Sequence, residues 1–165
     1  MEMLETFKKS DSRLLRTLSD KIMVDGFVQK NKDLIRLSII AHSLSKIVEK
    51  EYYKRDKVYW QKFSKELRGL LKELAEGKEN IGEIEKTVIE LDKHFGRYED
   101  NIIHHSKIKK GSTLYAWGMS LTLAAKLVDV PEYELMKQSG KTKIVDEEGL
   151  GRSVSERLKN AEESL

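Results

Sequence analysis

Apolar residues recur every three or four positions along most of this chain, which is the period of an α-helix with one buried side. In the clearest example, residues 57–74, apolar side chains gather on one side of a helix and basic side chains on the other. The apolar set is Trp60, Phe63, Leu67, Leu70, Leu71 and Leu74, and the basic set is Lys57, Lys62, Lys65, Arg68 and Lys72. Little raw material for β-sheet is present. The pattern therefore predicts an all-α chain.

Helix ends are predicted from side chains that cap a helix and from glycine, whose backbone readily leaves the helical conformation. The Ser-Asp-Ser segment at 10–12, Asn31 and Asp56 are expected to begin helices. Five glycines are expected to end them: Gly26, Gly77, Gly96, Gly111 and Gly140. The predicted helices cover residues 12–26, 32–53, 57–77, 81–95, 100–110, 120–128 and 131–139. We expect 141–152 to be extended or mobile, and 153–163 to form a last short helix.

The lengths of these helices predict the domain organisation. Four longer helices joined by short loops are typical of an antiparallel helical bundle, which we expect over residues 1–98. Shorter helices follow, and they predict a small helix-turn-helix-like unit over 99–145. The last segment, 146–165, is expected to be a charged tail that contains the final short helix.

Composition limits the function classes. Of the 165 residues, 36% are charged, compared with roughly 25% in an average globular domain. Such an excess of lysine and glutamate suits solvated helices and is common in proteins from hot environments. The chain has no cysteine, which excludes disulfide scaffolds, thiol catalysis and zinc fingers. It has no apolar run of membrane length and no signal-peptide pattern, so we expect a cytoplasmic protein without a membrane partner.

The distribution of charge is more informative than the formal net charge of +3. Residues 104–145 contain seven lysines and three acidic residues. Lysines at this density on one face attract the phosphate backbone of nucleic acids. The charge pattern therefore makes the segment 104–145 a candidate nucleic-acid contact.

The segment 120–139 resembles the helix-turn-helix of small prokaryotic DNA-binding and antitoxin-like proteins. The two helices of that motif cross closely, and Ala125 supplies the small residue needed in the first helix. Asp129 lies at the turn, where a residue that tolerates positive φ is required. Val130 and Leu135 take the buried positions that follow. The resemblance implies that the helix after the turn faces nucleic acid.

This resemblance leads to a non-enzymatic binding protein as the first functional hypothesis, with DNA or RNA as its partner. Its expected contacts are Lys107, Lys109, Lys110, Tyr133, Lys137, Gln138, Lys141 and Lys143. Glu132 and Glu134 oppose it, because phosphate repels carboxylates at the start of the second helix. The alternative is a module that binds a partner protein or a second copy of the chain. Its exposed apolar patch is expected at Leu114, Tyr115, Trp117 and Met119.

Two further patterns carry other interpretations. The segment 52–65 interleaves aromatic residues with lysine and arginine, a combination that can hold single-stranded nucleic acid. The alternative interpretation is that the same aromatic residues pack in the core, while the basic residues lie on the solvent-exposed face of the helix. Arg36 and His42 are similar to the Arg and His signature of HEPN-type ribonucleases, which makes such a ribonuclease the third hypothesis. It requires both side chains in one cleft.

No set of residues predicts catalysis or metal binding. Asp100 with His104 has a spacing suited to one ion on a helix, and His94 is a candidate third ligand, but no further spacing supports a site. No serine is placed beside a base by the sequence. We therefore expect no catalytic residues, no metal and no cofactor.

Overall fold

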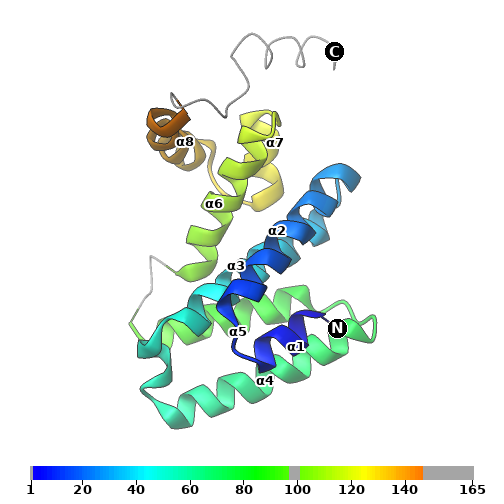
Figure 1. Ribbon diagram of the computed structural model, residues 1–165, viewed down its shortest axis with the longest axis vertical. Coiled ribbons are helices and arrows are strands. Elements are labelled where there is room, and N and C mark those ends of the chain that lie inside the picture. Colours follow the sequence, from blue (N-terminus) through cyan, green and yellow to red (C-terminus); the bar gives the residue numbers. More distant parts are fainter. Residues whose placement is uncertain (1, 97–100, 147–165) are drawn as a thin grey trace. The chain divides into compact units, whose positions relative to one another are not determined.

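The computed structural model describes residues 2–96 and 101–146, with side chains up to Ser139. These residues form eight α-helices and one short 3-10 helix and no β-strand, which confirms the predicted all-α fold (Figure 1). The α-helices are α1 (Glu2–Lys8), α2 (Ser12–Gln29), α3 (Lys32–Glu49), α4 (Lys57–Ala75), α5 (Ile81–His94), α6 (Ile102–Ala116), α7 (Leu121–Val128) and α8 (Glu132–Asp146). The 3-10 helix η1 (Glu51–Lys54) lies between α3 and α4.

The chain divides into two compact units, and the boundary between them lies within α6, after Ser106. Unit 1 contains α1 to α5 and the beginning of α6. Unit 2 contains the rest of α6 with α7 and α8. The sequence-based prediction had placed the division at residues 98 and 99. No helix in the described part of the chain is long and apolar enough to cross a membrane.

The first hairpin of unit 1 pairs α2 with α3 (Figure 1). Asp11 caps α2 by accepting hydrogen bonds from two backbone N–H groups, and Asn31 caps α3 in the same way. Between the helices Lys30 adopts the left-handed conformation, with φ of 50°. Both predicted caps are confirmed. Each satisfies backbone groups that the first turn of a helix leaves without a partner.

The second hairpin of unit 1 pairs α4 with α5. The predicted cap Asp56 is confirmed, because its carboxylate accepts the Tyr59 N–H at 3.0 Å. The loop between the helices turns at Gly77, whose φ is 92°, and the buried Asn80 donates a hydrogen bond to the Leu70 carbonyl at 2.9 Å. These contacts fix the start of α5 to the end of α4.

The helix α1 was not predicted from the sequence. It packs on α2, α3 and α4, and Figure 1 shows it lying beside α4. Its residue Phe7 is 2% exposed and meets Phe63 of α4 edge to face, with ring centroids 6.4 Å apart. A seven-residue segment is too short to show a helical period clearly. The contact between Phe7 and Phe63 joins α1 to the buried side of α4, and α1 in turn packs on the first two long helices.

A buried polar cluster joins η1, α5 and α6 within unit 1. Asp92 is fully buried and accepts hydrogen bonds from the Tyr53 hydroxyl and from the backbone N–H of Ile102. Burial, reinforced by the hydrogen bond to Asp92, raises the pKa of Tyr53, so the phenol stays protonated and donates. The α3 helix was expected to run through Tyr53, but it ends at Glu49 and η1 follows. The 3-10 turn places the Tyr53 ring, fully buried, next to Asp92.

Glycine had two different roles, which the sequence did not distinguish. Gly77 and Gly96 have positive φ and follow helix ends, as predicted. Gly26 and Gly111 instead lie inside helices α2 and α6, and α8 continues through Gly140, so these three predicted ends were wrong. A Cβ on Gly26 would lie 3.0 Å from Ile35 Cγ1 and 3.1 Å from the Ile35 backbone nitrogen. Close packing explains Gly26 and, as described below, Gly111.

The predicted segments beyond residue 140 are only partly described. Helix α8 continues to Asp146, so the extended or mobile stretch expected over 141–152 begins as helix. The remainder of that stretch and the helix expected at 153–163 lie outside the described residues.

Candidate functional site

The turn between α7 and α8 has the geometry that a helix-turn-helix requires. Asp129 adopts the left-handed conformation, with φ of 58° and ψ of 61°, as predicted from its place in the resemblance. Its N–H donates to the Ala125 carbonyl, and so does the N–H of Val130 at 3.1 Å. Ala125 is 3% exposed and Leu135 fully buried. A short turn therefore fixes the direction of α8 relative to α7.

Gly111 lets α6 approach these two helices. A Cβ at this position would lie 2.8 Å from Leu135 Cδ2 and 2.9 Å from Val128 Cγ2, distances that real Cβ atoms essentially never show. Helices α6, α7 and α8 thus meet closely at Gly111, and position 111 of α6 has no room for a side chain. A glycine is the only residue that this packing accepts without a shift.

The buried side chains of α8 lie on one side of the helix, and the opposite side is exposed. Leu135 and Ser139, one turn apart, are buried. Tyr133 and Met136 are 66% and 61% exposed, and Lys137 is exposed beside them. Residues three or four apart share a helix face, so these three form one surface, to which exposed Gln138 is adjacent. We call the four residues the α8 surface.

The lysines expected to contact nucleic acid differ in accessibility. Lys109 and Lys137 are exposed. Lys107 forms an ion pair with the turn residue Asp129, with Nζ and Oδ2 2.9 Å apart, and its side chain is 19% exposed. Lys110 is 3% exposed and belongs to the interior. The side chains of Lys141 and Lys143 lie outside the described residues.

Glu132 and Glu134 begin α8, where the helix dipole favours negative charge. Glu132 is exposed and Glu134 partly buried. Their position at the first turn gives them a role in stabilising α8. It also places negative charge at the end of the helix that is expected to approach nucleic acid first.

The apolar patch expected for a protein-binding module is not the one that unit 2 presents. Leu114 is fully buried. Tyr115, Trp117 and Met119 are partly buried. The exposed large apolar side chains among the described residues of unit 2 are Leu123, Tyr133 and Met136. Leu114 was wrongly predicted to be exposed. Helix α6 continues past Gly111, and this places the Leu114 side chain in the core.

Arg36 and His42 have different partners. The Arg36 guanidinium makes a bidentate ion pair with Glu85 of α5, with Nε–Oε1 and Nη2–Oε2 distances of 3.2 Å and 2.9 Å. His42 is 4% exposed, and its Nδ1 lies 3.0 Å from the Ser106 hydroxyl. The bidentate pair fixes α3 to α5, and the histidine contact fixes α3 to the start of α6. Both contacts hold the bundle together.

The histidines considered as metal ligands form hydrogen bonds and ring contacts with other residues. His94 hydrogen-bonds Asp56 at 3.0 Å and stacks on Tyr59, with ring centroids 3.6 Å apart. His104 lies in the first turn of α6, where its backbone N–H donates to the Asn101 side-chain oxygen. Asp100 lies outside the described residues. Among the residues that the structure describes, no three histidine or carboxylate side chains are grouped as metal ligands.

Most aromatic residues of the segment 52–65 are packed against other rings. The Tyr53 ring lies tilted against Tyr52, Tyr59 stacks with His94, and Phe63 meets Phe7. These contacts favour the interpretation of core packing for most of the segment. Trp60 also contacts the Phe63 ring, but its own ring is partly exposed and borders a hollow on the surface of α4.

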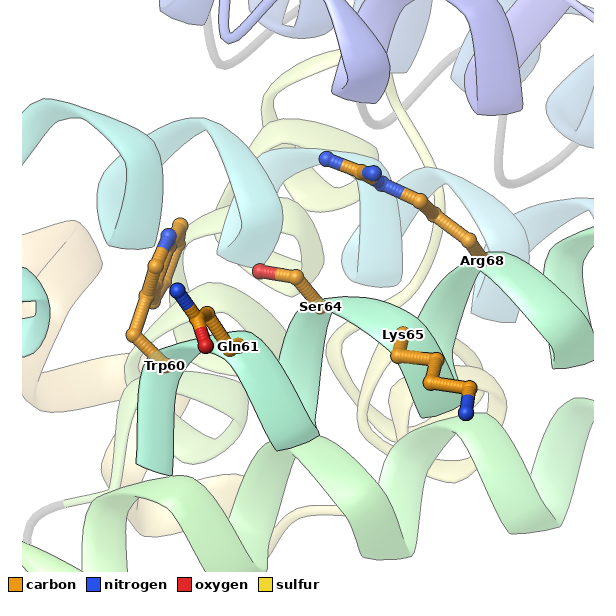
Figure 2. A pocket seen from close by; sticks show the side chains of 5 residues that line it. All are labelled: Trp60, Gln61, Ser64, Lys65 and Arg68. Atoms are coloured by element: carbon orange, nitrogen blue, oxygen red, sulfur yellow. The ribbon is translucent and has the colours of Figure 1, made fainter. Parts of the chain in front are cut away.

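This hollow, which we call the α4 hollow, has a volume of about 290 Å³. Its lining residues are Trp60, Gln61, Ser64, Lys65 and Arg68. Figure 2 shows Trp60 and Arg68 rising from its two ends with the Ser64 hydroxyl between them, and Lys65 directed outward. The sequence assigned Trp60 to the core and Lys65 and Arg68 to solvent. The four-residue spacing of Trp60, Ser64 and Arg68 places an apolar, a polar and a basic residue in one row of the helix, and it was the signal that could have revealed the site.

Comparisons with protein families, curated proteins and solved structures found no match for this chain. The function is therefore argued from its own residues.

Proposed function

We propose that this protein is a non-enzymatic nucleic-acid-binding protein that contacts DNA or RNA through unit 2. The observation that carries the proposal is the left-handed turn at Asp129, which sets α8 against α7 and leaves the α8 surface open. A helix face with aromatic and polar side chains suits base contacts, and we assign those contacts to Tyr133 and Gln138. Lys109 and Lys137 are exposed and suit phosphate contacts.

The distribution of charge along α8 indicates how it would approach the polymer. The carboxylates lie in its first turn, and Lys137, Lys141 and Lys143 follow in the later part of the sequence. Phosphate attracts the second part and repels the first. We therefore assign the phosphate contacts to the region from Lys137 onward, which differs from the usual approach of a recognition helix by its N-terminus.

The test compares two triple variants of equal charge. In the first, Lys137, Lys141 and Lys143 are changed to Ala. In the control, exposed Lys21, Lys32 and Lys86 of unit 1 are changed to Ala. Labelled duplex DNA, single-stranded DNA and RNA are titrated at several salt concentrations.

The proposal expects the first variant to bind more weakly than the wild type. Its salt dependence should fall by about one phosphate contact for each lysine removed that touches the backbone. The control should change much less. Equal losses in both variants, or no binding by the wild-type protein at low salt, would refute the proposal.

A second function is favoured by one observation, the exposure of large apolar side chains on unit 2. Tyr133 and Met136 lie side by side on α8, and such a pair suits burial against another protein. Under this proposal the α8 surface docks on a second copy of the chain. Changing Met136 to Lys would then abolish self-association in sedimentation experiments, whereas in nucleic-acid binding the added charge would tighten the complex.

A further inference from the structure

The α4 hollow lies on one side of one helix. Trp60, Ser64 and Arg68 are spaced by four residues, so they follow one row along α4. Eight residues of helix separate the first from the last by about 12 Å. The volume of about 290 Å³ lies just below the roughly 300 Å³ at which ligand sites begin. The hollow therefore suits one small planar group with a charged neighbour.

The indole of Trp60 forms one end of the hollow, and Phe63 supports it from below, with centroids 5.6 Å apart and planes at 39°. Phe63 is 4% exposed and anchored by the edge contact with Phe7. A tryptophan held by the core but partly open to solvent is a platform for stacking of a planar ligand. The aromatic neighbours Tyr53 and Tyr59 do not serve this purpose, because other rings cover them.

The cations of the hollow are not balanced by carboxylates of the described residues. Lys65 and Arg68 are exposed and form no ion pair there, whereas Arg36 and Lys54 elsewhere in unit 1 are paired. The acidic residues of α4 are engaged away from the hollow. Glu66 accepts a hydrogen bond from Thr87 of α5, and Glu73 accepts one from Lys78. The positive charge is thus left for an anionic occupant.

The floor of the hollow is polar. Ser64 is only 7% exposed, and its hydroxyl forms no hydrogen bond with the part of the chain that the structure describes. Gln61 lies at the rim and, within the same residues, is likewise without a hydrogen bond. The accessible Ser64 hydroxyl and the Gln61 amide offer donors and acceptors to the edge of a ligand, which a groove for an apolar helix would not need.

From these observations we propose that the α4 hollow holds one nucleotide of a single-stranded nucleic acid. The base stacks on Trp60, Ser64 and Gln61 hydrogen-bond its edge, and Arg68 and Lys65 bind the adjacent phosphate. Exposed Lys57 and Lys62 extend the positive charge along α4 for the neighbouring phosphates. A duplex does not fit this site, because its bases are already stacked and paired. The inference concerns unit 1 and does not rest on the function proposed for unit 2.

The first measurement uses the full chain with Trp117 changed to Phe, so that Trp60 is its one tryptophan. Stacking of a base on Trp60 is expected to quench its fluorescence when an oligothymidylate single strand is added. The same strand annealed into a duplex should not quench it. Quenching equal in both, or none with the single strand at low salt, would overturn the proposal.

The second measurement follows binding of a labelled oligothymidylate to variants. Trp60→Ala should weaken binding about tenfold, and Trp60→Phe, which retains a stacking ring, should recover most of that loss. The double change Lys65→Ala with Arg68→Ala should weaken binding and reduce its salt dependence by about two phosphate contacts. The control double change, Lys30→Ala with Lys86→Ala, removes two exposed lysines and should have little effect.

These outcomes separate the two sites. Loss of single-strand binding in the Trp60 variant but not in the Lys137, Lys141 and Lys143 variant supports the α4 hollow. Unchanged single-strand binding in Trp60→Ala refutes it, whatever the unit 2 variant does. Quenching of Trp60 by polyglutamate to the same extent as by oligothymidylate would also refute it, because the site would then recognise charge alone.

Discussion

Helices α4 and α8 both present positive charge to solvent, and they arrange it in opposite ways. On α4 the carboxylates are engaged with Thr87 and Lys78, and the cations around Trp60 are left unbalanced. On α8 the carboxylates occupy the first turn, and Lys137 follows beyond exposed Tyr133 and Met136. The lysine content of the sequence alone favoured α8 as the helix that binds an anionic partner. The positions of the acidic side chains decide which surface is free to bind an anion.

The two units also differ in how their helices are held together. Unit 1 is built mainly on two pairs of long helices, of which α2, α3 and α4 have side-chain caps, and several of its surface charges form ion pairs. Unit 2 depends on a close crossing at Gly111 and on a strained turn at Asp129. We therefore expect the stability of unit 2 to depend strongly on these two residues, although unit 1 also has a closely packed glycine, Gly26, and a left-handed residue, Lys30. Substitutions in each unit test this difference.

The largest effect is expected for Leu67→Ala in α4. Leu67 is fully buried, and removal of its side chain leaves a cavity in the core of unit 1. Such changes lower the free energy of unfolding by about 2–5 kcal/mol. Hydrogen exchange should accelerate in the helices of unit 1. Exchange confined to α4 alone would contradict a core shared along both hairpins.

Gly111→Ala is the next largest and acts on unit 2. The added methyl group collides with Leu135 and Val128, and overpacking of this kind costs about 1–3 kcal/mol. The better helix propensity of alanine, about 1 kcal/mol, offsets part of the loss. Exchange should accelerate in α7 and α8 and stay unchanged in α2 and α3. Gly69→Ala in α4, where nothing lies within 4 Å of the new Cβ, is the matched control and should stabilise the protein.

These glycines also show how far the sequence could predict the fold. Apolar periodicity and the caps at Asp11, Asn31 and Asp56 located the long helices, because those signals are local. A glycine that stops a helix and one that admits a neighbouring helix look the same in the sequence. The difference at Gly26 and Gly111 depends on contacts with distant residues, which only the folded chain supplies.

The candidate sites were predictable to different degrees. The positive φ at Asp129 followed from the demands of the turn, and the structure agrees. The burial of Lys110 and the ion pair of Lys107 did not follow, since both depend on packing within unit 2. The α4 hollow was not predicted from the sequence, because Trp60 lies at the edge of the apolar stripe. Whether such an edge residue is covered depends on which helices pack beside it.

A smaller effect is expected at the turn of unit 2. Asp129→Ala places a residue without a turn-forming side chain in the left-handed conformation and removes the Lys107 ion pair, at a cost of about 1 kcal/mol. Asp129→Gly also removes the ion pair but relieves the backbone, so it should lie within about 0.5 kcal/mol of the wild type. Thermal unfolding of the two variants measures the difference. If glycine were as destabilising as alanine, the ion pair rather than the backbone would hold the turn.

The smallest effect concerns acid pH and unit 1. The pKa of Asp56 is lowered from its usual 3.8, first by the hydrogen bond from the Tyr59 backbone and then by His94. A carboxyl group whose pKa is lower in the folded state stabilises that state above its ordinary pKa, and this contribution disappears as pH falls through the folded value. Asp56→Asn keeps a cap but removes the charge, so its unfolding free energy should fall less steeply between about pH 5 and pH 2. Asp25→Asn, at an exposed position of α2, is the control and should keep the wild-type slope. Equal slopes for Asp56→Asn and the wild type would mean that the charge at the start of α4 is fully screened, and that its cap acts through hydrogen bonding alone.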